Sequence, residues 1–159
     1  MRNPLKILVA EDDSGDALLL ERAFAKAMIR GPVYFVGDGE QVVDYLQGNR
    51  PFDNPVQHPL PDILLLDLRM PRMDGFAVLE WLRTQPRLRH IRVVVFSASD
   101  RREDMELAAS LGAKGYLVKP HRPEQLAGMV KTLEDDWLRI GETEHEQTGS
   151  RSQAAFSAG

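Results

Sequence analysis

Charged and hydroxyl side chains follow four apolar runs of this sequence, each at the point where the run ends. They are Glu11, Asp12 and Asp13 after residues 6–10, Asp67 after 63–66, Ser97 after 91–96, and Lys119 after 115–118. Neighbouring carboxylates repel one another and favour a bound cation. Mg²⁺ takes one or two carboxylates together with phosphate oxygens, and a lysine offers a point charge to a phosphoryl group. The set therefore favours phosphoryl transfer, with Asp67 as the carboxylate nucleophile.

The stretch PDILLLDLRMPRMDG, residues 61–75, carries the residue on which this chemistry depends. Its apolar run does not alternate, which is typical of a parallel strand buried on both faces. Asp67 ends the run, and a charge inside it would be costly to bury. Taken alone, this stretch leaves two interpretations of Asp67 open, a strand-end cap and a reactive carboxylate. The polar residues that follow the other apolar runs favour the reactive carboxylate.

Strand and helix patterns alternate along the chain. Predicted strands cover residues 6–10, 32–36, 63–66, 91–96 and 115–118; predicted helices cover 14–28, 40–46, 76–83 and 101–111, with a last one beginning at Pro123. Ser14 or Asp13 is the expected cap of the first helix, and Asp100 that of the fourth. Such alternation predicts an α/β domain with a parallel sheet and right-handed crossovers. The order 2-1-3-4-5 is borrowed from flavodoxin-like (βα)5 folds rather than deduced.

The carboxyl ends of all strands in a parallel sheet lie at the same edge. The polar residues that follow the apolar runs are therefore expected to meet there. We expect one domain over residues 1–140 and a disordered tail over 141–159, which is small, polar and without a helical stripe. Residues 48–60 form a long predicted loop rich in Pro and Asn. The four histidines lie apart, without the spacing of metal ligands.

Composition restricts the class of protein. The net charge of −4 disfavours a general surface for nucleic acid or an anionic membrane, and we expect neither as a direct partner. The chain has no cysteine, which excludes disulfides and thiolate chemistry. We find neither an apolar run long enough for a bilayer nor a signal peptide, so a cytoplasmic location is expected.

The motifs ILVAEDD, LLLDLRMPRMDG, VVFSAS and GYLVKP, in this order, resemble the receiver domain of two-component response regulators. The resemblance covers about residues 5–140. It implies that Asp67 accepts a phosphoryl group from a histidine kinase. It also implies that Glu11, Asp12, Asp67 and the backbone carbonyl of Arg69 hold Mg²⁺. Glu11 stands where Asp is more frequent in the family, so its longer arm is expected to reach the metal through water.

The same resemblance assigns four further roles. Ser97 is the expected switch hydroxyl, Tyr116 the aromatic that changes rotamer on activation, and Lys119 the phosphate-binding lysine. The Lys119–Pro120 bond is expected to be cis. An ordinary half-buried aromatic remains the alternative for Tyr116. Arg69 and Ser99 occupy positions that tune the phosphoryl lifetime in this family, which the sequence does not convert into a value.

The loop 48–60 and the segment EDDWLRI resemble the small regulators that pair with bacterial phytochromes, which suggests a bacteriophytochrome-type kinase as partner. The expected output is a conformational change on the face of the fourth helix, fifth strand and fifth helix, with a homodimer through that face. Trp137 and Leu138 are expected at a dimer contact or at the rim of the core. The downstream protein target is unknown.

Two other functions are weighed. An enzyme acting on a free metabolite through an aspartyl-phosphate would need a second carboxylate two residues after Asp67, where Arg69 stands. A pseudo-receiver that binds partners without phosphate would have lost part of the site, yet every part is present.

Overall fold

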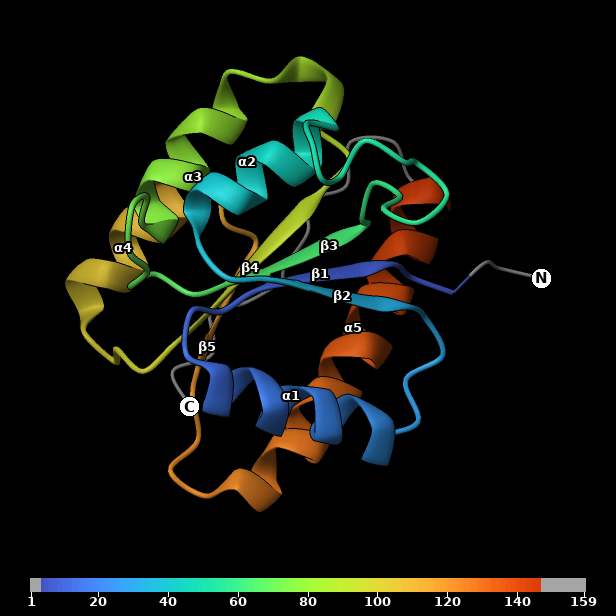
Figure 1. Cartoon of the computed structure of the whole chain (residues 1–159). Helices are drawn as coiled ribbons and strands as arrows, with labels where there is room; N and C mark the ends of the chain where they lie inside the picture. Colours follow the sequence, from blue (N-terminus) through green and yellow to red (C-terminus); the bar gives the residue numbers. More distant parts are fainter. Residues whose placement is uncertain (1–3, 147–159) are drawn as a thin grey trace.

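A computed structural model describes the backbone of residues 4–146 and the side chains of residues 4–136. The chain forms a five-stranded parallel sheet in the order β2-β1-β3-β4-β5, with helices on both of its faces (Figure 1). The strands are β1 (Ile7–Ala10), β2 (Val33–Val36), β3 (Ile63–Leu66), β4 (Arg92–Ser97) and β5 (Gly115–Val118). The flavodoxin-like fold and its strand order are thereby confirmed.

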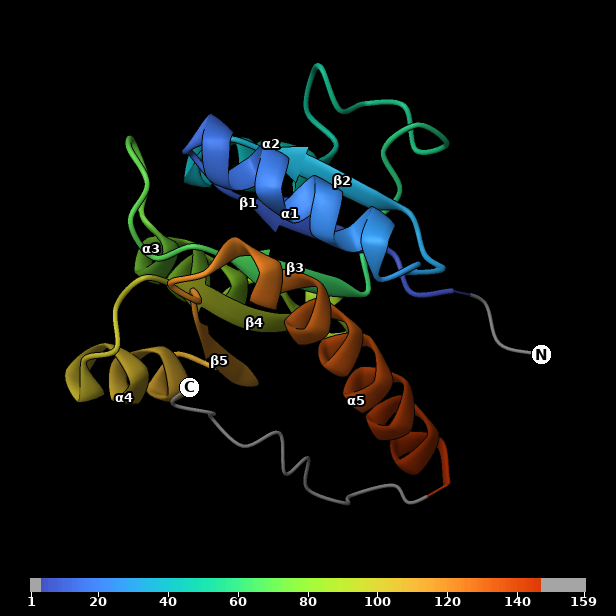
Figure 2. The same cartoon turned by 90° about the horizontal axis from the view of Figure 1, so that it is seen from below.

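The helices divide between the two faces of the sheet. They are α1 (Ser14–Lys26), α2 (Gly39–Gln47), α3 (Gly75–Arg83), α4 (Arg102–Ser110) and α5 (Leu126–Glu146), with 3-10 turns at η1 (Pro86–Leu88) and η2 (Pro123–Gln125). α1 and α5 pack together on one face, and α2, α3 and α4 cover the other (Figures 1 and 2). Among the described residues, no helix is long and apolar enough to cross a membrane.

The central strands are buried on both faces, which explains their unbroken apolar runs. Their residues alternate between two core clusters. Leu64 and Leu66 of β3 belong to the cluster under α2, α3 and α4, and Ile63 and Leu65 to the cluster under α1 and α5. A single strand thus supplies both cores, and its end is fixed from both sides.

The strand register places the polar residues that follow β1 and β3 side by side. Leu66 pairs with Ala10 of β1 and with Val95 of β4. The next backbone N–H, that of Asp67, donates to the Ala10 carbonyl at 3.1 Å. Glu11 and Asp67 therefore emerge next to each other at the carboxyl edge, as the sequence predicts for a parallel sheet.

Of the two residues expected to cap α1, one is confirmed, whereas the cap expected for α4 is wrong. Asp13, not Ser14, caps α1, because its Oδ1 accepts from the Asp16 N–H at 2.9 Å. Asp100 does not cap α4. That helix starts at Arg102 with no side-chain cap on Arg101, which leaves Asp100 one residue too far out.

The end of the chain also differs from the prediction. α5 continues to Glu146, so residues 141–146 are helical rather than disordered. The rest of the predicted tail, residues 147–159, lies outside the described part of the chain. The side chains of Trp137 and Leu138, expected at the rim or a dimer contact, also fall outside the described residues.

The predicted loop runs on from Gly48, which ends α2 with a left-handed backbone (φ 72°) that glycine tolerates. The loop folds back on α2, where Tyr45 packs against Phe52 and its hydroxyl donates to the Pro59 carbonyl at 2.9 Å. In the described part, the one cis peptide bond is Arg50–Pro51 of this loop.

The prediction of a cis bond at Lys119–Pro120 is wrong, since that bond is not cis in the structure. A trans X–Pro bond is the lower-energy form by about 0.5–1 kcal/mol. From this backbone the Lys119 ammonium reaches the carboxylates of Glu11 and Asp67 at the sheet edge.

Candidate functional site

Three carboxylates meet where β1 and β3 end. Asp67 is 7% exposed and Glu11 is 5% exposed, whereas Asp12 is open to solvent. One carboxylate oxygen from each of the three residues lies within 4.8 Å of the others. Oxygen ligands grouped in this way suit a hard divalent cation such as Mg²⁺, and Glu11, Asp12 and Asp67 are the residues that would hold it.

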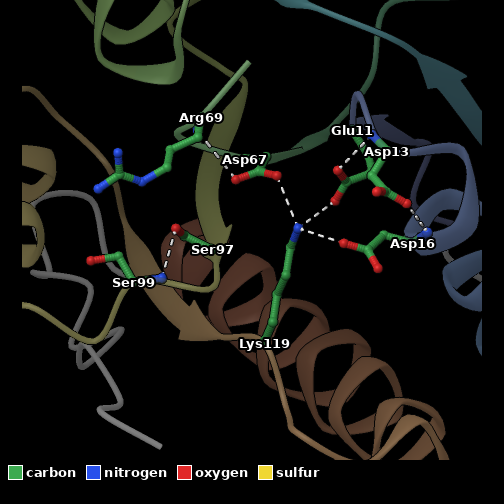
Figure 3. Close-up of polar contacts among 8 residues, drawn as sticks. All are labelled: Glu11, Asp13, Asp16, Asp67, Arg69, Ser97, Ser99 and Lys119. Carbon is green, nitrogen blue, oxygen red and sulfur yellow. Dashed lines mark hydrogen bonds and ion pairs between the residues drawn. The ribbon is translucent and has the colours of Figure 1, made fainter.

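Lys119 extends from the end of β5 into this group of acids (Figure 3). Its Nζ lies 2.7 Å from Glu11 Oε1, 2.9 Å from Asp67 Oδ2 and 3.2 Å from Asp16 Oδ2. Its own backbone is held by a hydrogen bond from the Lys119 N–H to the Ser97 carbonyl at 2.8 Å. Burial lowers the pKa of Lys119, but the contacts with Glu11 and Asp67 outweigh it and raise the pKa above its usual value. The lysine is therefore a fixed positive charge beside Asp67.

Glu11 carries the most perturbed carboxyl of the site. The pKa of Glu11 rises from 4.5 to about 7, mainly because the carboxyl is buried and in part because Asp67 repels the ionised form. The contacts with Lys119 and with the Asp13 N–H lower the pKa and offset only part of the burial effect. The ionised group is thus unfavourable in the folded chain without more positive charge, which a divalent cation would supply.

The backbone after Asp67 is fixed by contacts on both sides. The Arg69 N–H donates to Asp67 Oδ1 at 3.3 Å, and the Arg69 side chain is exposed. Gly75 approaches the Asp67 carbonyl so closely that a Cβ there would lie 2.5 Å from its oxygen. The conformation of residues 67–75 is therefore tightly specified at the point where the Arg69 carbonyl is expected to bind the metal.

Arg72 ties the loop of residues 67–75 to Asp38, which precedes α2. Its guanidinium binds Asp38 Oδ2 through Nε at 2.8 Å and Nη2 at 2.6 Å. Asp38 also caps α2 through the Gln41 N–H at 2.8 Å and is 1% exposed. Burial would raise the pKa of Asp38, but these contacts keep it below its usual value.

Ser97 ends β4, the strand next to β3, and Tyr116 lies on the neighbouring strand β5. Ser97 is buried, and its Oγ accepts from the Ser99 N–H at 3.1 Å. Tyr116 is fully buried, and its hydroxyl donates to the Ser99 carbonyl at 2.8 Å. Burial raises the pKa of this phenol. Ser97 and Tyr116 are thus joined through Ser99. Tyr116 is fully buried rather than half-buried, and its role as the switch aromatic stays a prediction.

The structure brings together Glu11, Asp12, Asp67, Ser97 and Lys119, as the strand ends predict. Asp16 was not predicted as a site residue, although its position on the first turn of α1, three residues after the cap Asp13, was a usable signal. The pairing of Asp38 with Arg72 was not predicted either. Nothing in the sequence links these two positions except their shared place at strand-to-helix connections.

The family model for the response regulator receiver domain matches residues 7–131. The chain belongs to the response regulator receiver family. The match spans all five strands and the start of α5, and it includes every predicted site residue. Membership makes the chain a receiver of a two-component system rather than an enzyme acting on a free metabolite.

Two curated relatives cover nearly the same region. The chain is 36% identical to the probable methanogenesis regulatory protein FilR2 of Methanothrix harundinacea, over 86% of this chain and 85% of FilR2. It is 32% identical to the response regulator Rcp1 of Synechocystis, over 86% of this chain and 91% of Rcp1.

Solved structures give the same family. The response regulator RPA3017 in red light signalling of R. palustris is 36% identical, with a TM-score of 0.76 over 93% of this chain and 96% of that one. The phosphorylated cyanobacterial phytochrome response regulator RcpA is 33% identical, with a TM-score of 0.78 over 87% and 96%. The Mn²⁺-bound form of Rcp1 is 31% identical, with a TM-score of 0.75 over 85% and 95%. The chain thus resembles the phytochrome response regulator RcpA and the response regulator Rcp1, which has a solved Mn²⁺-bound form.

Proposed function

We propose that this chain is a single-domain response regulator that accepts a phosphoryl group on Asp67 from a histidine kinase in a Mg²⁺-dependent phosphorelay. The observation that carries the proposal is the contact of Asp67 Oδ2 with Lys119 Nζ at 2.9 Å, beside the carboxylates of Glu11 and Asp12. A nearly buried carboxylate, a group of acids that suits a cation and a fixed ammonium are the parts that phosphoryl transfer to a carboxylate needs.

The reaction breaks the N–P bond of a phosphohistidine and forms an O–P bond to the Asp67 carboxylate. The histidine nitrogen keeps the bonding electron pair and takes a proton. Glu11, Asp12, Asp67 and the Arg69 carbonyl would hold Mg²⁺, which neutralises charge on the transferred oxygens. Lys119 would move from its carboxylate partners to a phosphoryl oxygen, and the Ser97 hydroxyl would donate to another.

We place the switch at Ser97 and Tyr116. Drawing Ser97 toward a phosphoryl group would break its hydrogen bond from the Ser99 N–H, which belongs to the loop that also receives the Tyr116 hydroxyl. A change in that loop would alter the Tyr116 rotamer and the face formed by α4, β5 and α5. Leu107 of α4 is 44% exposed, which supports a homodimer or a downstream protein as the reader of the switch.

A bacteriophytochrome-type kinase is the partner that we propose, acting in the cytoplasm. The support comes from relatives: RcpA is a cyanobacterial phytochrome response regulator, and RPA3017 acts in red light signalling. FilR2 is as similar in sequence as RPA3017 and has a different assigned role, so phosphotransfer from a purified phytochrome kinase is the deciding test of this partner.

The phosphorylation itself is tested by intact-mass spectrometry after incubation with acetyl phosphate and MgCl₂. We expect one added phosphoryl group, with a charge change of about −1.5 to −2 near neutral pH. The gain should require Mg²⁺ and should be absent in Asp67→Asn. If wild-type protein binds Mg²⁺ but gains no mass, the chain is a pseudo-receiver and the proposal fails.

A further inference from the structure

Asp16 is a fourth carboxylate at the site, and the roles set out above do not use it. It lies on the first turn of α1, and its Oδ2 is 3.2 Å from Lys119 Nζ (Figure 3). Its side chain is 45% exposed, whereas those of Glu11 and Asp67 are nearly buried. Asp16 therefore stands at the rim of the site, on the solvent side of the ammonium.

The Lys119 ammonium is shared among three carboxylates in this structure. Two of them, Glu11 and Asp67, also belong to the group whose oxygens lie within 4.8 Å of one another and suit a divalent cation. A cation held by that group would repel the ammonium and compete for the same two carboxylates. Asp16 is the partner of Lys119 that such a cation would leave available.

We propose that Asp16 is a positioning residue that retains Lys119 at the rim of the site when Mg²⁺ takes Glu11 and Asp67. Before the metal binds, Asp16 is one of three partners of the ammonium; afterwards it becomes the main one. The Asp16–Lys119 contact is therefore stronger in the metal-bound state, and it favours metal binding. It also keeps the ammonium close to the position of an incoming phosphoryl group. This inference rests on the proposed function.

The direct test is isothermal titration calorimetry of the full chain with MgCl₂, comparing wild type with Asp16→Asn. The substitution keeps the backbone N–H that bonds to Asp13 Oδ1, so the cap of α1 is preserved. Glu21→Gln is the matched control, because it removes one negative charge from an exposed position of the same helix. We expect Mg²⁺ affinity to fall roughly two- to fivefold in Asp16→Asn, the range of a partly exposed ion pair. Glu21→Gln should leave it unchanged.

A double-mutant cycle separates an effect through Lys119 from direct attraction between Asp16 and the metal. In the Lys119→Met background, Asp16→Asn should lower Mg²⁺ affinity no more than Glu21→Gln does. An equal loss in both backgrounds would overturn the inference, because Asp16 would then act on the metal itself. Equal affinities of Asp16→Asn and Glu21→Gln in the wild-type background would also overturn it.

Failure of the proposed function has a different signature. Wild-type protein that binds no Mg²⁺, or whose Mg²⁺ affinity is unaffected by Asp12→Asn, would refute the metal site itself. Wild-type binding that Asp12→Asn weakens, combined with no effect of Asp16→Asn, would refute the positioning role alone.

Discussion

Replacing Glu11 by Gln is expected to stabilise the metal-free protein while weakening its metal site. Glu11 is 5% exposed, and its burial raises the pKa from 4.5 to about 7 despite the contact with Lys119. The folded chain therefore holds the Glu11 proton more tightly than the unfolded chain does. The contribution of Glu11 to wild-type stability is fully present below pH 4.5 and is lost as the pH rises through about 7, where the folded group ionises.

The magnitude follows from those two pKa values. Moving a pKa from 4.5 to about 7 corresponds to about 3 kcal/mol of free energy. A Gln side chain does not ionise, so it avoids this cost, and its amide oxygen can still accept from Lys119. The free energy of unfolding of Glu11→Gln should match that of wild type near pH 4.5. It should exceed the wild-type value by about 3 kcal/mol at pH 8.

Urea unfolding between pH 4.5 and 8.5 in EDTA measures this difference, and subtracting wild type cancels the other titrating groups. Glu21→Gln, an exposed acid on α1, should show a difference within about 0.5 kcal/mol at every pH. Adding MgCl₂ at about 100 times its dissociation constant should stabilise wild type by about 2.7 kcal/mol and the variant by less. A Glu11→Gln difference that does not change with pH, or that becomes negative at pH 8, would refute the reasoning.

Two further substitutions probe the surroundings of the site. Gly39→Ala would place a Cβ 2.1 Å from the Met73 carbonyl oxygen, so we expect a loss of about 1–3 kcal/mol in urea unfolding, and an unchanged midpoint would contradict that contact. Tyr116→Phe removes the donor to the Ser99 carbonyl and should cost about 1 kcal/mol. Tyr45→Phe is its control, because it breaks a similar bond between α2 and the loop that follows it. Both substitutions should destabilise the protein. Only Tyr116→Phe should change the rate of phosphorylation by acetyl phosphate.

The sequence was sufficient for the fold class because its local patterns agree with a parallel sheet covered on both faces. Unbroken apolar runs such as residues 63–66 need two buried faces, and their alternation with helices leaves a parallel sheet as the consistent arrangement. The main site followed from the same logic, since parallel strands bring Glu11, Asp67 and Lys119 to one edge. The strand order itself came from likeness to known folds and not from the residues.

What the sequence did not predict depends on side-chain geometry between elements. The choice of Asp13 over Ser14 as a cap is decided by which oxygen reaches the Asp16 N–H. In the Asp38–Arg72 pair, two guanidinium nitrogens donate to one carboxylate oxygen and join two loops. The spacing of these residues in the sequence does not predict this contact. The isomer of a prolyl bond depends on its tertiary surroundings, because the intrinsic preference for trans is only about 0.5–1 kcal/mol.

The most direct test of the account is to locate the phosphoryl group. Wild-type protein incubated with acetyl phosphate and MgCl₂ would be reduced with borohydride, which converts an aspartyl-phosphate into homoserine, and then digested for tandem mass spectrometry. The account predicts homoserine at position 67, dependent on Mg²⁺ and absent without acetyl phosphate. Homoserine at another aspartate, or none in protein that binds Mg²⁺, would contradict the claim that Asp67 is the phosphoryl acceptor.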